Sequence, residues 1–162
     1  MPIVSDITRQ APRALLAAGL SCLALWPAGG HAADPRVERG EALLNQLNQG
    51  RQQPVYEAMR KEFPFLAEAT AGYALGDVWG RQVLDARTRQ LAAMAAFASL
   101  GLRGFFKTHA GYALDAGVPP DELKEIVYLV TVPAGFPRAI EASQALQELL
   151  AERGLTRQQP AP

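Results

Sequence analysis

Apolar residues recur at helical spacing from about residue 36 onward, and no stretch alternates apolar and polar residues as a half-buried strand does. The clearest segment is Asp85–Leu100, in which Asp85 suits the N-cap and the residues Leu91–Ala98 are apolar on all sides. The expected helices are 36–49, 54–61, 65–79, 85–100, 103–116, one that begins near Pro120 and one that begins at Pro137. The pattern predicts an all-α, single-domain helical bundle of about six or seven helices.

Helix-breaking residues separate these segments. Gly101 follows one predicted helix, and Gly117 follows the next. Pro133 and Gly135 are expected to break the helix that begins near Pro120. Gly72 and Gly76 lie inside the 65–79 segment and are expected to loosen it.

The first 32 residues have the three-part pattern of a secretory signal peptide. Arg9 and Arg13 give a basic start, Ala14–Trp26 is an uncharged apolar run, and small residues follow. The run is shorter than the roughly 20 residues that a membrane-spanning helix needs. We expect cleavage after Ala32 or Ala33 and export to the periplasm or the outside, with no membrane association afterwards.

Two alternatives for this segment stay open. Cys22 is a candidate lipidation cysteine, although Gly19 stands where a lipobox has leucine. An uncleaved anchor is the second alternative, and the short apolar run disfavours it. The expected organisation is a signal peptide over 1–32, a folded domain over 36–153 and a flexible tail over 154–162.

Charge and cysteine content exclude several classes of function. The 162 residues carry 16 Lys+Arg and 16 Asp+Glu, so there is no basic excess to bind the phosphates of a nucleic acid. One cysteine excludes an intramolecular disulfide and a multi-cysteine metal cluster. Without residues 1–32 the chain keeps one histidine, His109, and no cysteine. We therefore expect neither thiol chemistry nor a metal site within one chain.

His109 is the main candidate for chemistry. It follows Phe105 and Phe106 and shares an apolar helix side with Tyr112. It is either a core histidine bonded to a backbone carbonyl or a general acid or base in an apolar pocket, where small shifts set its pKa near the working pH.

Arg87 and Arg89 occupy the first turn of the helix that Asp85 begins. Cations there oppose the helix dipole, and the carboxylate of a ligand would offset that cost. The alternative is a pair of solvated arginines bonded to Asp85 or Glu62.

Three further residues are weaker candidates. Glu125 is either an ordinary exposed acid or a partner of the catalytic group. Trp79 and Tyr128 either pack in the core or form the wall of a pocket.

Several short motifs follow one another along the chain. They are Asp77–Arg81, Leu84–Leu91, His109 with Ala113-Leu114 and Gly117-Val118, Glu122–Glu125, and Ala134–Pro137. In order and spacing they resemble the carboxymuconolactone decarboxylase family, over roughly residues 42–150. The resemblance implies an all-α fold shared with alkylhydroperoxidase D-like proteins, and self-association into a trimer or hexamer with pockets near subunit contacts.

The resemblance also separates two branches. In the peroxidase branch a Cys-x-x-Cys pair precedes the histidine, and here Leu102 and Phe105 stand at those positions. Thiol peroxidase activity is therefore not expected. The chain is more similar to the decarboxylase branch, but it has Leu129 where that branch usually has histidine and Pro133 where it usually has tyrosine.

The implied reaction is the decarboxylation of a small unsaturated lactone or carboxylic acid without a cofactor. Arg87 or Arg89 would hold a spectator carboxylate or the lactone oxygen. His109 would donate or shuttle the proton, and Glu125 would orient His109 or a water. Trp79 and Tyr128 would contribute to substrate binding.

Two other classes of function remain. A non-catalytic small-molecule-binding protein of the same fold is favoured by Leu129 and Pro133, which make the pocket less polar. A purely structural oligomer would have His109 enclosed in its core.

Overall fold

The structure, a computed structural model, describes residues 34–156. The predicted signal peptide, with Cys22 and His31, lies outside the described residues, as do residues 157–162 of the predicted tail. The described part contains seven α-helices and one π-helix and no strand, which confirms the all-α prediction. None of these helices is both long and apolar enough to cross a bilayer.

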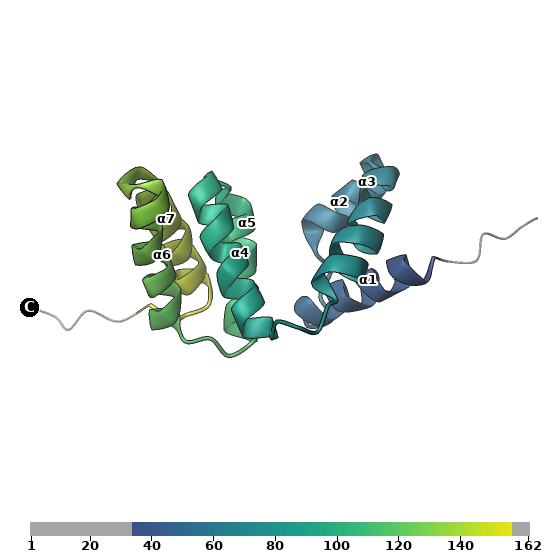
Figure 1. Cartoon of the computed structure of the whole chain (residues 1–162), viewed down its shortest axis with the longest axis horizontal. Helices are drawn as coiled ribbons and strands as arrows, with labels where there is room; N and C mark the ends of the chain where they lie inside the picture. Colours follow the sequence, from purple (N-terminus) through teal and green to yellow (C-terminus); the bar gives the residue numbers. More distant parts are fainter. Residues whose placement is uncertain (1–33, 157–162) are drawn as a thin grey trace, which may run out of the picture. The chain divides into compact units, whose positions relative to one another are not determined.

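Most of the helices begin at a side-chain cap or at a proline in their first turn. In chain order (Figure 1) they are α1 (Pro35–Leu47), α2 (Pro54–Glu62), α3 (Pro64–Ala69), η1 (Thr70–Trp79), α4 (Ala86–Leu100), α5 (Arg103–Asp115), α6 (Pro120–Ala134) and α7 (Phe136–Glu152). The Asp34 carboxylate accepts a hydrogen bond from the Arg36 amide at 2.8 Å, and the Asp85 carboxylate accepts one from the Thr88 amide at 2.7 Å. Each bond satisfies an amide that the first turn of a helix leaves unpaired.

Glycines in the left-handed or otherwise positive-φ region end two of the helices. Gly101 has φ 73° after α4, and Gly135 has φ 82° after α6. The expectation that Pro133 breaks α6 is wrong, because the helix continues through Pro133 to Ala134. Pro133 lies in the last turn, where its missing amide removes only one backbone hydrogen bond.

The hydrophobic residues form two separate clusters. In the larger one, α4 packs against α5, α6 and α7. Its fully buried members include Met94, Phe106, Ala110, Ala113, Leu123 and Ala145. The smaller cluster combines α1, α2, α3 and η1, with Tyr56, Ala67 and Ala71 at its centre.

Helices α1 and η1 cross at very close range because glycines lie at the contact. A Cβ atom on Gly40 would overlap the backbone carbonyl of Ala71, and one on Gly76 would overlap the carbonyl of Arg36. Beside this crossing the Asp77 carboxylate accepts a hydrogen bond from Arg36 Nε at 2.7 Å. The crossing fixes η1 against α1, and η1 in turn positions the residues of the candidate site.

Candidate functional site

A cavity of about 440 Å³ with mostly apolar walls opens between helices of the described residues. We call it the apolar chamber. Its lining comes from α1, α2, η1, α4 and α5 and comprises Leu44, Leu47, Gln53, Val55, Tyr56, Met59, Thr70, Ala74, Leu75, Trp79, Phe97, Gly104, Phe105, Thr108, His109 and Tyr112. Pockets of about 300–1,000 Å³ with mostly apolar walls and a few polar groups are typical of small-molecule sites.

The π-helix is what brings four of these lining residues to one side. Trp79 follows Thr70 by nine positions, which is two and a half turns of an α-helix, so the two side chains would lie on opposite faces. In a π-helix each amide bonds the carbonyl five residues back, with about 4.4 residues per turn, and nine positions make about two turns. Thr70, Ala74, Leu75 and Trp79 therefore share a face. The bond from the Gly80 amide to the Leu75 carbonyl, 2.8 Å long, continues this pattern to the helix end.

His109 lies on α5 among the aromatic residues of the chamber. Its ring centroid is 5.0 Å from that of Phe97 and 5.1 Å from that of Trp79. Tyr112 presents its ring edge-on at 5.6 Å. The histidine is thus neither enclosed in the core, as the structural alternative required, nor fully solvated.

The partner of His109 is a buried side-chain amide. Gln90, on α4, is 1% exposed, and its Oε1 lies 2.7 Å from His109 Nδ1. Because Oε1 can only accept, Nδ1 carries the hydrogen and donates it, which leaves the lone pair on Nε2. Gln90 therefore fixes the ring with Nε2 as its free base.

Burial sets the charge of this imidazole. Desolvation lowers the pKa of His109 from 6.5 to about 4, because the apolar surroundings stabilise the charged form less than water does. At neutral pH the ring is therefore uncharged. It can accept a proton from a ligand. It can also hold a proton and form an ion pair with the carboxylate of a ligand.

The structure places the six predicted site residues in different locations. His109 and Trp79 both line the chamber. Glu125 is exposed on α6, as is Tyr128 with 61% of its surface accessible, and neither belongs to the chamber lining. Arg87 forms an ion pair with Glu122, and Arg89 binds backbone carbonyls.

Arg89 closes the C-terminal end of η1. One of its terminal nitrogens donates to the carbonyls of Val78 and Trp79, and the other donates to Arg81 and, at 2.9 Å, to Leu84. These carbonyls belong to the end of η1 and the connection to α4, where the backbone has no helical partner for them. The guanidinium carbon also lies 5.9 Å from the centroid of the Trp79 ring. Arg89 thus acts as a cap that positions Trp79.

Replacing Arg89 with alanine should lower the free energy of unfolding by about 2 kcal/mol, because it leaves several carbonyls without a charged donor. Arg87→Ala is the matched control on the same helical turn, since it removes only an exposed ion pair and should cost well under 1 kcal/mol. Urea unfolding followed by circular dichroism measures both. Equal losses in the two variants would contradict the capping role.

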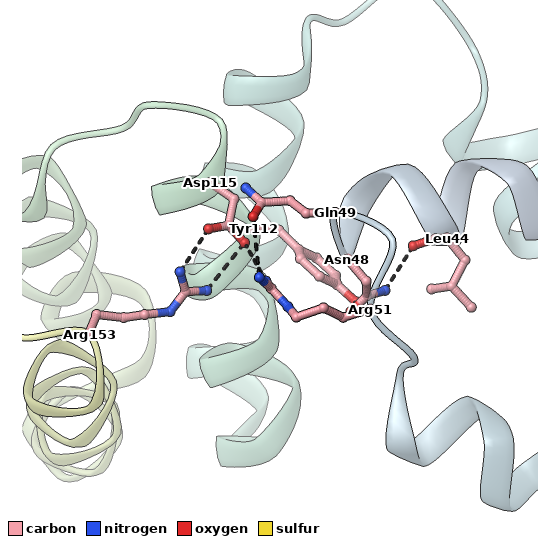
Figure 2. Close-up of polar contacts among 7 residues, drawn as sticks. All are labelled: Leu44, Asn48, Gln49, Arg51, Tyr112, Asp115 and Arg153. Atoms are coloured by element: carbon pink, nitrogen blue, oxygen red, sulfur yellow. Dashed lines mark hydrogen bonds and ion pairs between the residues drawn. The ribbon is translucent and has the colours of Figure 1, made fainter.

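A second, polar cavity adjoins the chamber. We call it the vestibule; its volume is about 330 Å³. Gln53, Gly104, Thr108 and Tyr112 line both cavities, and the vestibule adds Asn48, Arg51, Pro54, Lys107, Gly111, Asp115, Leu149, Glu152 and Arg153. Figure 2 shows the polar contacts at this point, where Arg51 and Arg153 both approach the Asp115 carboxylate.

Tyr112 connects the two helix clusters at the boundary of the cavities. Its hydroxyl donates to the Asn48 side chain at 3.1 Å, and Asn48 in turn donates to the Leu44 carbonyl at 2.8 Å (Figure 2). Burial raises the pKa of Tyr112, so the hydroxyl stays protonated and remains a donor. Within residues 34–156 no group of three or more His, Cys, Asp or Glu side chains is arranged to hold a metal ion.

Comparisons with known proteins match this chain to a protein family and to two relatives. The family model described as "Carboxymuconolactone decarboxylase family" matches residues 64–148. A 4-carboxymuconolactone decarboxylase of Acinetobacter baylyi is 31% identical over 83 residues, which is 51% of this chain and 62% of that protein. The chain therefore spans less than two thirds of the length of that relative. The uncharacterized protein MJ1511 of Methanocaldococcus jannaschii is 27% identical over 97 residues, or 60% of this chain and 90% of that protein.

Proposed function

Because this chain belongs to the carboxymuconolactone decarboxylase family, we propose that it decarboxylates, or transfers a proton to or from, a small unsaturated lactone or carboxylic acid without a cofactor. The observation that carries the proposal is His109, a neutral imidazole with one nitrogen fixed by Gln90, in the wall of an apolar chamber. We propose export as well, from the sequence of residues 1–32 alone.

The proton balance follows from the low pKa of His109. The substrate carboxylate enters the chamber, and one proton from solvent is taken up by Nε2 as the ion pair forms. The carbon–carbon bond to the carboxylate then breaks, its electron pair enters the unsaturated lactone as an enolate, and carbon dioxide leaves. Nε2 donates its proton to the carbon, so that R–CO₂⁻ + H⁺ gives R–H + CO₂.

The apolar lining favours this step. The carboxylate charge is concentrated before the bond breaks and is spread over the lactone afterwards, so surroundings that solvate the carboxylate poorly lower the barrier. No arginine or lysine belongs to the chamber lining. A permanently charged arginine or lysine on the departing carboxylate would stabilise the ground state further than the His109 ion pair does, and this lining contains neither.

Incubation of the purified protein with unsaturated lactone acids tests the proposal. We expect carbon dioxide release and, in D₂O, one deuterium on the product carbon. The saturated counterparts are the control, because they lack the conjugated system that accepts the electron pair. If neither carbon dioxide nor deuterated product forms from any unsaturated member, the proposal fails.

A non-catalytic binding protein is the second candidate. Of the side chains that line the chamber, His109 alone can become charged below neutral pH or beside a ligand's carboxylate, since Tyr56 and Tyr112 have raised pKa values and stay neutral. A chamber with one such group also suits simple retention of a ligand. Thermal stabilisation by a lactone acid without product would favour this function.

Exposed apolar residues on α6 and α7 support self-association, which stays a prediction. Tyr128, Leu129, Val132, Phe136 and Ile140 are each more than half exposed. Side chains of this size in water are typical of surfaces that other protein chains cover. Tyr128, predicted to bind substrate, belongs to this surface.

A further inference from the structure

We infer that the apolar chamber and the vestibule form one elongated site for an amphipathic acid, with the apolar body in the chamber and the carboxylate on Arg51. The inference shares its chamber with the proposed function but concerns binding, and it names a residue outside the family-matched range of 64–148. Four observations support it: the lining that the two cavities share, their contrast in polarity, the spare hydrogen-bonding capacity of Arg51, and an unobstructed glycine at the junction.

The two cavities are adjacent and opposite in character. Gln53, Gly104, Thr108 and Tyr112 line both, so the two spaces meet at these four residues. The chamber holds aliphatic and aromatic side chains, whereas the vestibule holds three cations and two carboxylates. Their volumes of about 440 and 330 Å³ together exceed what a small lactone fills, and a longer ligand with one charged end matches both.

Two of the three vestibule cations are already paired. Arg153 donates to both oxygens of Asp115, at 2.8 and 3.2 Å. Lys107 lies 2.6 Å from a carboxylate oxygen of Glu152. Neither cation is the first choice for a ligand, because binding one would break a close ion pair.

Arg51 keeps most of its hydrogen-bonding capacity. It lies 3.6 Å from the same Asp115 carboxylate that Arg153 already binds, and it donates to Gln49 Oε1 at 3.3 Å (Figure 2). Its side chain is 60% exposed. A guanidinium has five N–H donors in a planar fork that matches a carboxylate. One carboxylate shared by two guanidinium groups leaves positive charge unpaired, and an incoming carboxylate would neutralise it.

The turn that carries Arg51 is built by two residues of positive φ. Gln49 has φ 52° and Gly50 has φ 77°. The left-handed backbone conformation is unfavourable for glutamine, as it is for other L-residues with a Cβ atom. This reversal between α1 and α2 places Arg51 at the vestibule, where its donors meet Asp115.

Gly104 gives direct access to the junction of the two cavities. It lies on α5, and a Cβ atom built on it would meet no atom within 4 Å. A large side chain at this position would therefore enter open space that both cavities share, without disturbing the helix. Gly104→Leu is thus a blocking variant that should still fold.

Isothermal titration of the full-length protein with ω-phenylalkanoates, from phenylacetate to 6-phenylhexanoate, and with the matching alcohols tests the inference. Affinity should rise with chain length, and each acid should bind more tightly than its alcohol. Arg51→Ala should weaken the acids about tenfold and leave the alcohols unchanged. Gly104→Leu should weaken the longer members of both series.

Arg60→Ala is the charge-matched control, because Arg60 is exposed on α2 and lines neither cavity. It should bind like the wild type. Equal affinity for acids and alcohols, unchanged acid binding in Arg51→Ala, or no binding by the folded wild type would overturn the inference. These ligands have no unsaturated lactone to accept the electron pair and cannot be decarboxylated by the proposed route. A failure of this binding test therefore leaves carbon dioxide release from lactone acids intact, and a failure of that release leaves the binding inference intact.

Discussion

Replacing His109 with glutamine is expected to lower turnover of an unsaturated lactone acid by about 10²–10⁴-fold, the usual contribution of a positioned general acid or base. Glutamine keeps a hydrogen-bonding amide of similar size but cannot carry a proton to carbon. Binding should change much less than turnover, because the remaining chamber lining is intact. Steady-state rates of carbon dioxide release, with affinity from titration of a saturated analogue, measure the two effects separately.

Gln90→Leu serves as the companion variant. It keeps the imidazole but removes the acceptor that holds the hydrogen on Nδ1. If Gln90 is a positioning residue, this variant should lose turnover and also shift its pH profile, whereas a purely structural role would change stability alone. Full activity in His109→Gln would remove the proposed mechanism.

Gly40→Ala is expected to lower the free energy of unfolding by about 3 kcal/mol, at the upper end of the cost of overpacking. The new methyl group would overlap the backbone carbonyl of Ala71, which cannot rotate away as a side chain can. Helix η1 would have to move off α1, and Trp79 and Leu75 would move with it. Urea unfolding measures the loss.

Gly104→Ala is the matched control for this prediction. The same methyl group on α5 meets nothing within 4 Å, and alanine favours a helix over glycine by about 1 kcal/mol. Stability should therefore be equal to or above that of the wild type. A Gly40→Ala protein as stable as the Gly104→Ala protein would show that the α1–η1 crossing is not as close as described.

Helix positions could be predicted from the sequence because their signals are local. The prediction of a helix over Asp85–Leu100 matches α4 (Ala86–Leu100), with Asp85 as the N-cap. The capping carboxylate and the glycine at the end lie within the segment that they delimit. The same reasoning placed α5 within one residue of its end at Asp115.

The π-helix could not be predicted in this way. The sequence predicts one helix over 65–79 that Gly72 and Gly76 loosen, since hydrophobic periodicity is normally compared with 3.6 residues per turn. The structure instead has α3 followed by η1, whose geometry accompanies the packing of Gly76 against α1. That contact joins residues far apart in the chain.

The candidate site was predicted in part. His109 is a candidate from the sequence because it is the lone histidine beyond the predicted signal peptide, and Trp79 is a weaker candidate. Gln90 was missed, although an uncharged polar residue sharing a helix face with Met94 and Phe97 was a signal that could have identified it. Arg89 binds carbonyls at the end of the preceding helix and in the connection after it. This contact depends on the fold, so the spacing of residues along the sequence does not indicate it.

The charge state of His109 tests the central claim most directly. Nuclear magnetic resonance of the full-length protein with ¹⁵N-labelled histidine, with His109→Gln to assign the signal apart from His31, follows its titration. We predict a ring that is neutral at pH 7, protonated on Nδ1, with a pKa of about 4. A saturated lactone acid should raise this pKa and bind more tightly as the pH falls towards 4, because the complex takes up a proton that the free ring lacks. A pKa near 6.5 that the ligand does not change would contradict the account.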